Sequence, residues 1–454
     1  YAIVIGNRVL SLTVKVHLTK NPIIPKFIDL FWARQSCMTG FVKFSHFRPT
    51  LFLAYVLASV GFAGEITPTD WPQWRGPTRD SQVVDAQWPN SLDENHLELS
   101  WEVAHEPSYS GPVVVGNRVF TTETEKKKNE VVYAYDKITG EELWRTEWEG
   151  AMTVPFFAAS NGSWIRATPA CDGETLYVAG MCDVLYALNC ETGDTKWHVD
   201  FKKRFDSPMP AFGFASSPLV HGDAIFVQAG GGFIKLNKTT GETLWRVAVN
   251  GGGMFGSAFS SPVMATLENK NILLVQTRKS LKGIDPLTGE EMWSQDIEAF
   301  RGMNILTPTV HDGTIFTSAH SGRSQLWRHT GQSPSLEEIW SGKSQAYMSS
   351  PVVITGHLYL HLRNQRIVCI NLETGEENWR TTPFGKYQSM AVLDNKILAL
   401  DETGELLLIR ANPNKFDLID RRRIAQNNTW GHIAVSKNQI FIRRLDGLAV
   451  YNWQ

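Results

Sequence analysis

The chain has 454 residues, of which 43% are hydrophobic and 20% are charged, and its formal net charge is −2. This composition is ordinary for a soluble globular protein, and the charge excludes the basic field that nucleic-acid-binding proteins carry. Five cysteines are too few for a disulfide framework, while 36 glycines and 16 tryptophans predict many tight turns and repeated packing.

The first 64 residues are expected to lie outside the folded domain. Residues 1–37 show no clear periodicity, and the first methionine of the sequence is Met38. We therefore interpret residues 1–37 as an upstream or non-native extension, and Met38 as the natural start of the protein.

Residues 38–64 have the order of a secretory signal peptide. Lys43 and Arg48 form a positive segment, residues 51–62 are apolar, and Ala63 is one of the small residues that follow. The apolar run of about 12 residues is short for a bilayer, although a short membrane anchor is the alternative. The segment predicts export to the periplasm or the cell exterior, with no transmembrane domain after cleavage.

One phrase, Asp/Asn-x-x-Thr-Gly-x-x-x-Trp, recurs through residues 97–454 at intervals of about 40–50 residues. The apolar alternation before each Asp or Asn predicts a half-buried strand, and Gly supplies the positive φ that ends the turn. Trp opens the next strand, where it can fill the wedge between neighbouring twisted sheets. The tryptophans assigned to this structural role are Trp101, Trp144, Trp197, Trp245, Trp293, Trp340 and Trp379, and the glycines are Gly140, Gly193, Gly241, Gly289 and Gly375.

An upstream phrase such as Ser217-Pro-Leu-Val adds a strand and a tight hairpin to each copy, so that each unit has four strands, A to D. Seven units are counted, and the chain ends with only three further strands. The missing strand is available around Trp101, which would close the ring and hide its edges. We therefore predict an all-β fold, an eight-bladed β-propeller of four-stranded antiparallel blades over residues 97–454. A seven-bladed ring with an irregular end is the alternative.

The best copies of the phrase are Val132-Tyr-Ala-Tyr-Asp136 leading to Trp144 and Leu185-Tyr-Ala-Leu-Asn189 leading to Trp197. On these residues the chain resembles the pyrroloquinoline-quinone-like (PQQ-like) propeller repeat family. That family includes quinone-dependent alcohol and sugar dehydrogenases and a non-catalytic lipoprotein of the outer-membrane assembly machinery.

The segment before the ring also resembles relatives of that family. Residues 70–77, Asp-Trp-Pro-Gln-Trp-Arg-Gly-Pro, are similar to the lead-in of many secreted members. We expect residues 65–96 to form an N-terminal lead-in whose Trp71 and Trp74 cap the ring.

Antiparallel order places the D-to-A connections and the B–C turns on one face of the ring, called the funnel face below. Its connections are rich in aromatic residues and poor in acids. Arg166 and Arg301 each precede an A strand, so we expect both near the ring axis, where they could hold a flat or anionic ligand. The alternative is that the aromatics pack on one another and the arginines pair with acids. The predicted ligand-binding residues are Arg166, Arg301, Asn304, Trp164, Phe255, Tyr347, Tyr387, Trp430 and His432.

The resemblance to the dehydrogenases implies features that this sequence lacks. Those enzymes have an adjacent Cys–Cys disulfide, calcium held by acidic and amide side chains, and often a Cys-x-x-Cys-His haem segment. No two cysteines are adjacent here, and the amides of Asn304, Asn427 and Asn428 have no obvious acidic partner. We assign no catalytic residue and no metal site. PQQ and calcium would be the cofactors if the protein is a quinoprotein alcohol or sugar dehydrogenase.

Three of the five cysteines, Cys171, Cys182 and Cys190, fall in one unit. Cys171 and Cys190 would lie near the same face, which leaves a disulfide open in an oxidising compartment. Two strands' separation makes that bond awkward, and buried free thiols are the alternative.

The leading hypothesis is a monomeric, non-catalytic binding or scaffold module of the cell envelope. Its funnel face would bind an envelope protein or a small ligand, and not nucleic acid. The alternatives are a PQQ-dependent oxidoreductase and a carbohydrate-binding accessory protein, the latter indicated only by the aromatic loops.

Overall fold

The structure is a computed structural model that describes residues 2–5, 8–11, 65–256, 258–332 and 335–454. The chain divides into two units, residues 1–61 and 62–454. In the first, β1 (Ala2–Ile5) and β2 (Arg8–Ser11) form an antiparallel pair. The expected signal peptide lies outside the described residues and stays a prediction.

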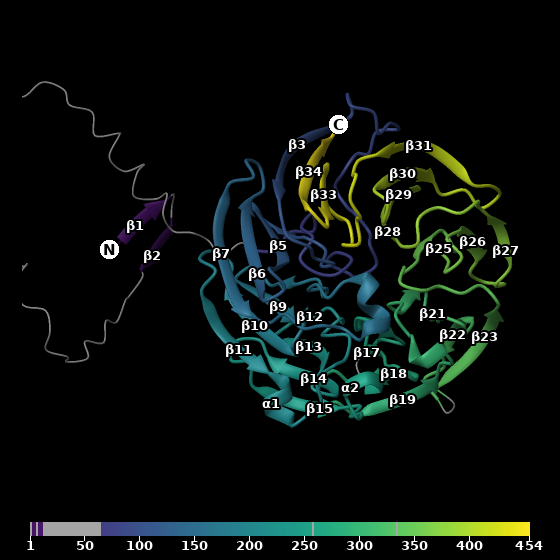
Figure 1. Cartoon of the computed structure of the whole chain (residues 1–454), viewed down its shortest axis with the longest axis horizontal. Coiled ribbons are helices and arrows are strands. Elements are labelled where there is room, and N and C mark those ends of the chain that lie inside the picture. The colour runs from purple at the N-terminus through teal and green to yellow at the C-terminus, as the bar shows by residue number, and fades with distance from the viewer. Residues whose placement is uncertain (1, 6–7, 12–64, 257, 333–334) are drawn as a thin grey trace, which may run out of the picture. The chain divides into compact units, whose positions relative to one another are not determined.

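In the second unit, the described residues form eight four-stranded antiparallel sheets (Figure 1). In seven of these sheets the strand order follows the chain, so each is a meander, and the eighth combines the first strand of this unit with the last three. The first four blades are β4 (Val113–Val115), β5 (Arg118–Glu125), β6 (Asn129–Asp136), β7 (Glu142–Glu149); β8 (Ala170–Cys171), β9 (Thr175–Gly180), β10 (Val184–Asn189), β11 (Thr195–Asp200); β12 (Leu219–His221), β13 (Ala224–Ala229), β14 (Gly232–Asn237), β15 (Thr243–Val247); and β16 (Val263–Leu267), β17 (Lys270–Gln276), β18 (Ser280–Ile284), β19 (Glu291–Asp296).

The last four blades complete the ring. They are β20 (Thr309–His311), β21 (Thr314–Ser318), β22 (Ser324–His329), β23 (Leu336–Gly342); β24 (Val352–Ile354), β25 (His357–His361), β26 (Ile367–Asn371), β27 (Glu377–Arg380); β28 (Gln388–Leu393), β29 (Lys396–Asp401), β30 (Glu405–Arg410), β31 (Asp417–Arg423); and β32 (Ala434–Ser436), β33 (Gln439–Arg444), β34 (Gly447–Trp453) with β3 (Leu97–Ala104).

The eighth blade joins the two ends of the propeller. β3 pairs with β34 from Leu97 opposite Trp453 to Ala104 opposite Gly447. The predicted eight-bladed ring, closed by an N-terminal strand, is confirmed, and the seven-bladed alternative is wrong. The pairing hides the edge that a three-stranded last blade would expose.

The helices of this unit are short and lie in connections between blades. They are η1 (Phe156–Asn161), α1 (Phe201–Phe205), α2 (Gly253–Gly256) and η2 (Phe300–Gly302). Within the described ranges, no helix is long and apolar enough to cross a membrane.

The repeat tryptophans lie where consecutive blades meet. Each C–D strand pair has a register shift beside the position of the repeat Trp, as at Ala134/Tyr135 next to the Ala134–Trp144 pair. Such a bulge turns the strand and re-aims the side chain. The Trp144 indole Nε1 then donates to the Cys190 carbonyl of the next blade at 2.9 Å, and Trp340 Nε1 donates to the Leu372 carbonyl at 2.8 Å.

The lead-in occupies the axis of the ring (Figure 1). Trp71 forms a β-bridge with Val114 of the first blade, and the Cys171 amide of the second blade donates to the Pro72 carbonyl at 2.8 Å. The Val83 amide donates to the Val392 carbonyl of the seventh blade at 2.7 Å. One short segment therefore binds the inner strands of blades far apart in the sequence.

Two buried arginines complete these contacts. The Arg79 guanidinium donates to the carbonyls of Pro218 and of Pro262, in the third and fourth blades. The Arg75 guanidinium donates to the Pro351 carbonyl of the sixth blade. Burial lowers the pKa of Arg79 to about 9.

The fifth and eighth blades are reached by Trp74. Its indole Nε1 donates to Thr307 Oγ1 at 3.1 Å, and its ring meets the His432 ring edge-on at 4.9 Å. Through these contacts the lead-in touches all eight blades and forms the floor beneath the funnel face.

Candidate functional site

Six aromatic rings follow one another around part of the funnel mouth, a set called the first aromatic arc below. Consecutive centroids are 5.6, 4.9, 5.8, 4.4 and 4.5 Å apart. All six come from D-to-A connections or a B–C turn of successive blades, from the fifth through the eighth to the entry of the first. In order they are Phe300, His320, Tyr347, Tyr387, Trp430 and Tyr109.

Burial at this arc is partial, so edges and faces of the rings remain accessible. Phe300 is 48% exposed, and the other five side chains are intermediate. Burial raises the pKa of Tyr109 to about 12, which keeps its phenol neutral at physiological pH. Apart from Phe300, the rings of the arc carry a polar atom on an apolar body, a composition suited to binding.

Three phenylalanines on the opposite part of the mouth form the second aromatic arc. Phe157 of η1 meets Phe212 at 6.2 Å, and Phe212 meets Phe259 at 5.5 Å. Beside them, Phe156 is 90% exposed and Phe255 of α2 is 70% exposed. Phe156 meets the Phe157 ring edge-on at 5.6 Å, but most of the Phe156 and Phe255 surface stays exposed, which is unusual for large hydrophobic residues.

Arginines lie over both arcs. The Arg166 guanidinium is 5.8 Å from the Tyr109 ring centroid, Arg301 is 5.2 Å from Phe300, and Arg278 is 4.6 Å from Phe259. These distances fall within the range of cation–π attraction. Within the part of the chain that the structure describes, neither Arg166 nor Arg301 forms an ion pair. The mouth is thus aromatic and cationic.

The predicted site residues separate into two groups. The first group lies on the funnel face and consists of Arg166, Arg301, Trp164, Phe255, Tyr347, Tyr387 and Trp430. Within it, Arg166 Nε donates a hydrogen bond to the Trp164 carbonyl. Asn304 and His432 are instead buried inside the protein. Ligand binding by the first group is a proposal, taken up below.

The internal roles of these two buried residues are clear from their bonds. Asn304 Nδ2 donates to the carbonyls of Arg278 and Ile297 at 3.2 and 3.3 Å. His432 packs on Trp74, and burial lowers the pKa of its imidazole to about 3. Both residues precede an A strand, as the residues at the funnel mouth do, but their side chains make contacts inside the protein.

Several mouth residues were absent from the predicted set. His320 sits in a B–C turn, and Phe259 and Arg278 lie next to strands where no repeat feature distinguishes them. Tyr109 and Phe157 occur in connections already recognised as aromatic. The signal that could have found them is the recurrence of one aromatic residue at the same connection in successive blades.

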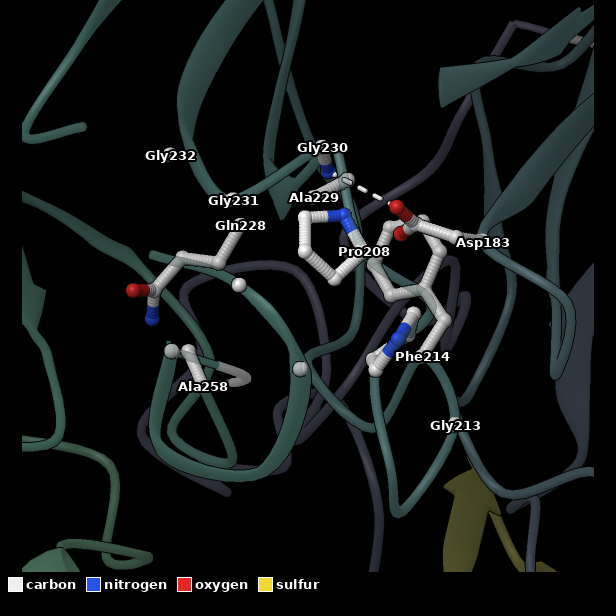
Figure 2. A pocket seen from close by; sticks show the side chains of 14 residues that line it. Asp183, Pro208, Gly213, Phe214, Gln228, Ala229, Gly230, Gly231, Gly232 and Ala258 are labelled. Atoms are coloured by element: carbon white, nitrogen blue, oxygen red, sulfur yellow. Dashed lines mark hydrogen bonds between the residues drawn. The ribbon is translucent and has the colours of Figure 1, made fainter. Parts of the chain in front are cut away.

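A small glycine-rich pocket lies beside the second arc, between the second and third blades (Figure 2). Its one acid is Asp183, whose Oδ2 accepts a hydrogen bond from the Gly230 amide at 3.0 Å. Desolvation raises the pKa of Asp183 to about 6. Pro208, Phe214 and backbone atoms of Gly230 and Gly252 form the walls. The pocket has room for a small group that donates a hydrogen bond.

The acidic side chains that the structure describes do not fit the calcium site of the dehydrogenases. The described residues include no group of three His, Cys, Asp or Glu side chains that could together hold a metal ion. Asn304 uses its amide nitrogen inside the protein, and Asn427 Nδ2 donates to Asp446 at 2.6 Å on the rim. The side-chain amides of Asn304 and Asn427 therefore hydrogen-bond to separate parts of the chain.

The chain matches the family model described as "Outer membrane protein assembly factor BamB" over residues 90–158 and 127–381. The protein of that name from Yersinia pestis is 22% identical over 282 residues, which cover 60% of this chain and 66% of that protein. The one from Moranella endobia is 21% identical over 337 residues, covering 72% of this chain and 79% of that protein. The chain thus spans about two thirds or somewhat more of these relatives' length.

Among solved structures, BamB from Moraxella catarrhalis has a TM-score of 0.59 at 15% identity, with 79% of this chain and 98% of that chain covered. At this identity the likeness shows the fold. Because the family match extends over more than half of the sequence, the chain belongs to the PQQ-like β-propeller family described as outer membrane protein assembly factor BamB.

Proposed function

We propose that this protein is an exported, non-catalytic scaffold of the cell envelope that binds a partner protein through its funnel face. The observation that carries the proposal is the pair of aromatic arcs at the mouth of an otherwise regular ring. Rings with accessible edges on a rigid scaffold supply contact area at a small cost in conformational entropy. Tyrosine, tryptophan and arginine, which dominate binding energy at interfaces, are concentrated here.

The chemistry of the mouth indicates what kind of partner segment fits it. Phe156 and Phe255 offer exposed apolar surface, and Arg301 and Arg166 offer positive charge, with Arg166 also interacting electrostatically with the buried carboxyl of Glu130. A segment with apolar side chains and carboxylates would bury the first and pair with the second. The floor made by the lead-in limits how deeply such a segment could enter.

The relatives support an envelope role. Proteins of Yersinia pestis and Moranella endobia that match this chain are named outer membrane protein assembly factors. The signal-peptide pattern over residues 38–64 agrees with that location. A folded scaffold that acts on other envelope proteins needs no catalytic group, and we assign none.

Site-specific photo-crosslinking tests the proposal directly. A benzophenone amino acid at Tyr387, in the first arc, should crosslink one defined envelope protein when the full chain is exported in its own cells. The matched control is Ile138, which is 60% exposed in a C–D turn on the opposite face. The proposal predicts a crosslinked band at Tyr387 that is absent at Ile138.

Equal crosslinking at both positions, or none at Tyr387 in exported protein, would overturn the funnel-face proposal. A band at Ile138 alone would move the interface to the face of the C–D turns. Protease protection of the protein in intact cells, measured on the same samples, tests export separately from binding.

A further inference from the structure

Two cysteine side chains of the second blade lie in contact. Cys171 ends the inner strand β8, and Cys190 follows β10, with β9 between them. Their Sγ atoms are 3.2 Å apart, and each residue is only 2% exposed. Two strands that are not neighbours in a sheet usually hold their side chains too far apart for such contact.

The turns explain how the gap is closed. β8 and β10 both end on the face opposite the funnel, so the A–B turn and the C–D turn emerge side by side. The Cys190 amide donates to the Glu174 carbonyl of the other turn at 3.0 Å, and the Gly173 amide donates to Cys171 Sγ at 3.3 Å. A backbone hydrogen bond therefore joins the two turns across β9.

Each turn is also rigid in itself. Asp172 Oδ1 accepts hydrogen bonds from the amides of Glu174 and Thr175 at 3.1 and 2.8 Å. Asn189 Oδ1 accepts one from the Glu191 amide at 2.7 Å. Asx turns of this kind fix the backbone beside each cysteine.

A residue of the first blade also holds the backbone of Cys190 in place. Trp144 Nε1 donates to the Cys190 carbonyl at 2.9 Å, and both cysteines pack in the same hydrophobic cluster as Trp144. Few alternative positions are open to either sulfur in the folded protein. Formation of a disulfide requires the sulfurs to close from 3.2 Å to about 2.05 Å.

We propose that Cys171 and Cys190 form a structural disulfide in the mature protein. The two thiols lose two protons and two electrons, and the electrons reduce one disulfide of an oxidising partner to two thiols. That partner is a dithiol-disulfide protein or oxidised glutathione, and the exchange passes through one mixed disulfide. The bond encloses the whole of β9 and β10 and constrains the unfolded chain.

The other described cysteines serve as internal controls. Cys182 is half-buried in the B–C turn at the opposite end of the same blade, and Cys369 is buried in β26, where it contacts the Tyr359 hydroxyl. Neither has a thiol neighbour among the described residues. Both should stay reduced under conditions that oxidise the pair.

Peptide mapping of the exported full chain tests the proposal. Trypsin leaves all three cysteines of the blade in one peptide, residues 167–196, because no Lys or Arg lies between Arg166 and Lys196. Additional cleavage by chymotrypsin after Tyr177 and Tyr186 separates them. After alkylation in guanidinium without reductant, we expect a linked peptide pair containing Cys171 and Cys190, while Cys182 carries the alkyl group.

Stability supplies a second readout. Reductant should lower the melting temperature of the wild type by about 2–4 °C and leave Cys190→Ser unchanged, whereas Cys182→Ser should respond like the wild type. Alkylation of both Cys171 and Cys190 in exported wild-type protein would overturn the proposal, as would a link from either residue to Cys182. The mapping needs only the wild type, so a variant that fails to fold leaves the test intact.

Discussion

The indole of Trp101, on the first strand of the ring, lies directly against Gly140 in the C–D turn of the first blade. A methyl group on Gly140 would be 2.6 Å from Trp101 Cδ2, and Trp101 Nε1 donates to the Lys137 carbonyl at 3.0 Å. The same arrangement joins Trp144 to Gly193 and Trp340 to Gly375. Glycine in the repeat therefore has two functions, to adopt positive φ and to accept the face of the preceding blade's tryptophan.

Gly140→Ala should destabilise the protein by about 2–4 kcal/mol, since it combines a left-handed backbone with a clash against Trp101. The matched control is Gly116→Ala. Gly116 has a φ of +57°, close to the +73° of Gly140, and a methyl group there would meet no atom within 4 Å. Guanidinium denaturation of the two variants separates the backbone effect from the packing effect. Equal losses would show that the Trp–Gly contact adds nothing.

Arg79, which anchors the lead-in at the axis of the ring, supports a second prediction. Arg79→Met should lower the free energy of unfolding by about 3–5 kcal/mol, because it leaves buried carbonyls of Ser217, Pro218 and Pro262 without a donor. Arg328→Met is the control, since Arg328 is an exposed residue that pairs with Glu337 at 3.3 Å on the outer strand of the fifth blade. A change there should stay within about 1 kcal/mol. Similar small losses for both variants would show that the lead-in is not anchored by Arg79.

The repeat made the fold predictable because its information is local. Turn formers such as Asn189 and Gly193 act within a few residues, and their regular spacing counts the blades. The strand around Trp101 was assigned to the last blade because three strands at the end of the chain leave an edge open. Both inferences needed only residue type, alternation and spacing.

The axis and the mouth were less predictable because their contacts are long-range. Arg79 would ordinarily be expected at the surface, yet its partners lie at Pro218 and Pro262, far along the sequence. His432 follows Trp430 by two residues, but the backbone turns one ring to the mouth and the other to the core. Side-chain direction in an irregular connection depends on neighbouring blades, which a single sequence does not display.

The buried carboxyl of Glu130 predicts a pH dependence of stability. Glu130 accepts hydrogen bonds from Trp148 Nε1 at 2.8 Å and from the Met181 amide at 2.7 Å, but desolvation outweighs both and raises its pKa from 4.5 to about 7. Between these values the unfolded chain has lost the proton that the folded protein keeps. The free energy of unfolding should therefore fall as pH rises from about 4.5 to 7, by at most about 3 kcal/mol from this group.

The comparison with Glu130→Gln isolates this effect, because every other titrating group, including Asp183, is shared. The amide lowers stability by a constant amount, since its NH₂ faces one of the two donors. Urea denaturation at pH 5 and pH 8 should show the wild type losing more stability than the variant over that interval. Parallel curves would mean that the carboxyl ionises near its ordinary pKa in the folded protein.

Quinone binding provides a test of the alternative function. Because the described residues lack a converging carboxylate site for calcium, calorimetric titration of the full chain with PQQ and calcium should give no saturable heat. Saturable binding that is lost in the Arg166→Ala, Arg301→Ala double variant would contradict this and favour the dehydrogenase. Binding that survives the double variant would place the quinone away from the mouth.

The centre of the first arc should dominate partner binding. Trp430 lies between Tyr109 and Tyr387, with centroids at 4.5 and 4.4 Å, so Trp430→Ala removes contacts on both sides of the ring. Affinity for the partner identified by crosslinking should fall about 30-fold or more, as for an aromatic residue at the centre of an interface. Trp197→Ala is the control. The Trp197 indole donates to the Lys238 carbonyl at 3.1 Å, between the second and third blades and remote from the mouth. That variant should lose stability and keep its affinity when measured below its melting temperature. The reverse pattern, with affinity lost at Trp197 and retained at Trp430, would show that the partner depends on blade packing and not on the aromatic mouth.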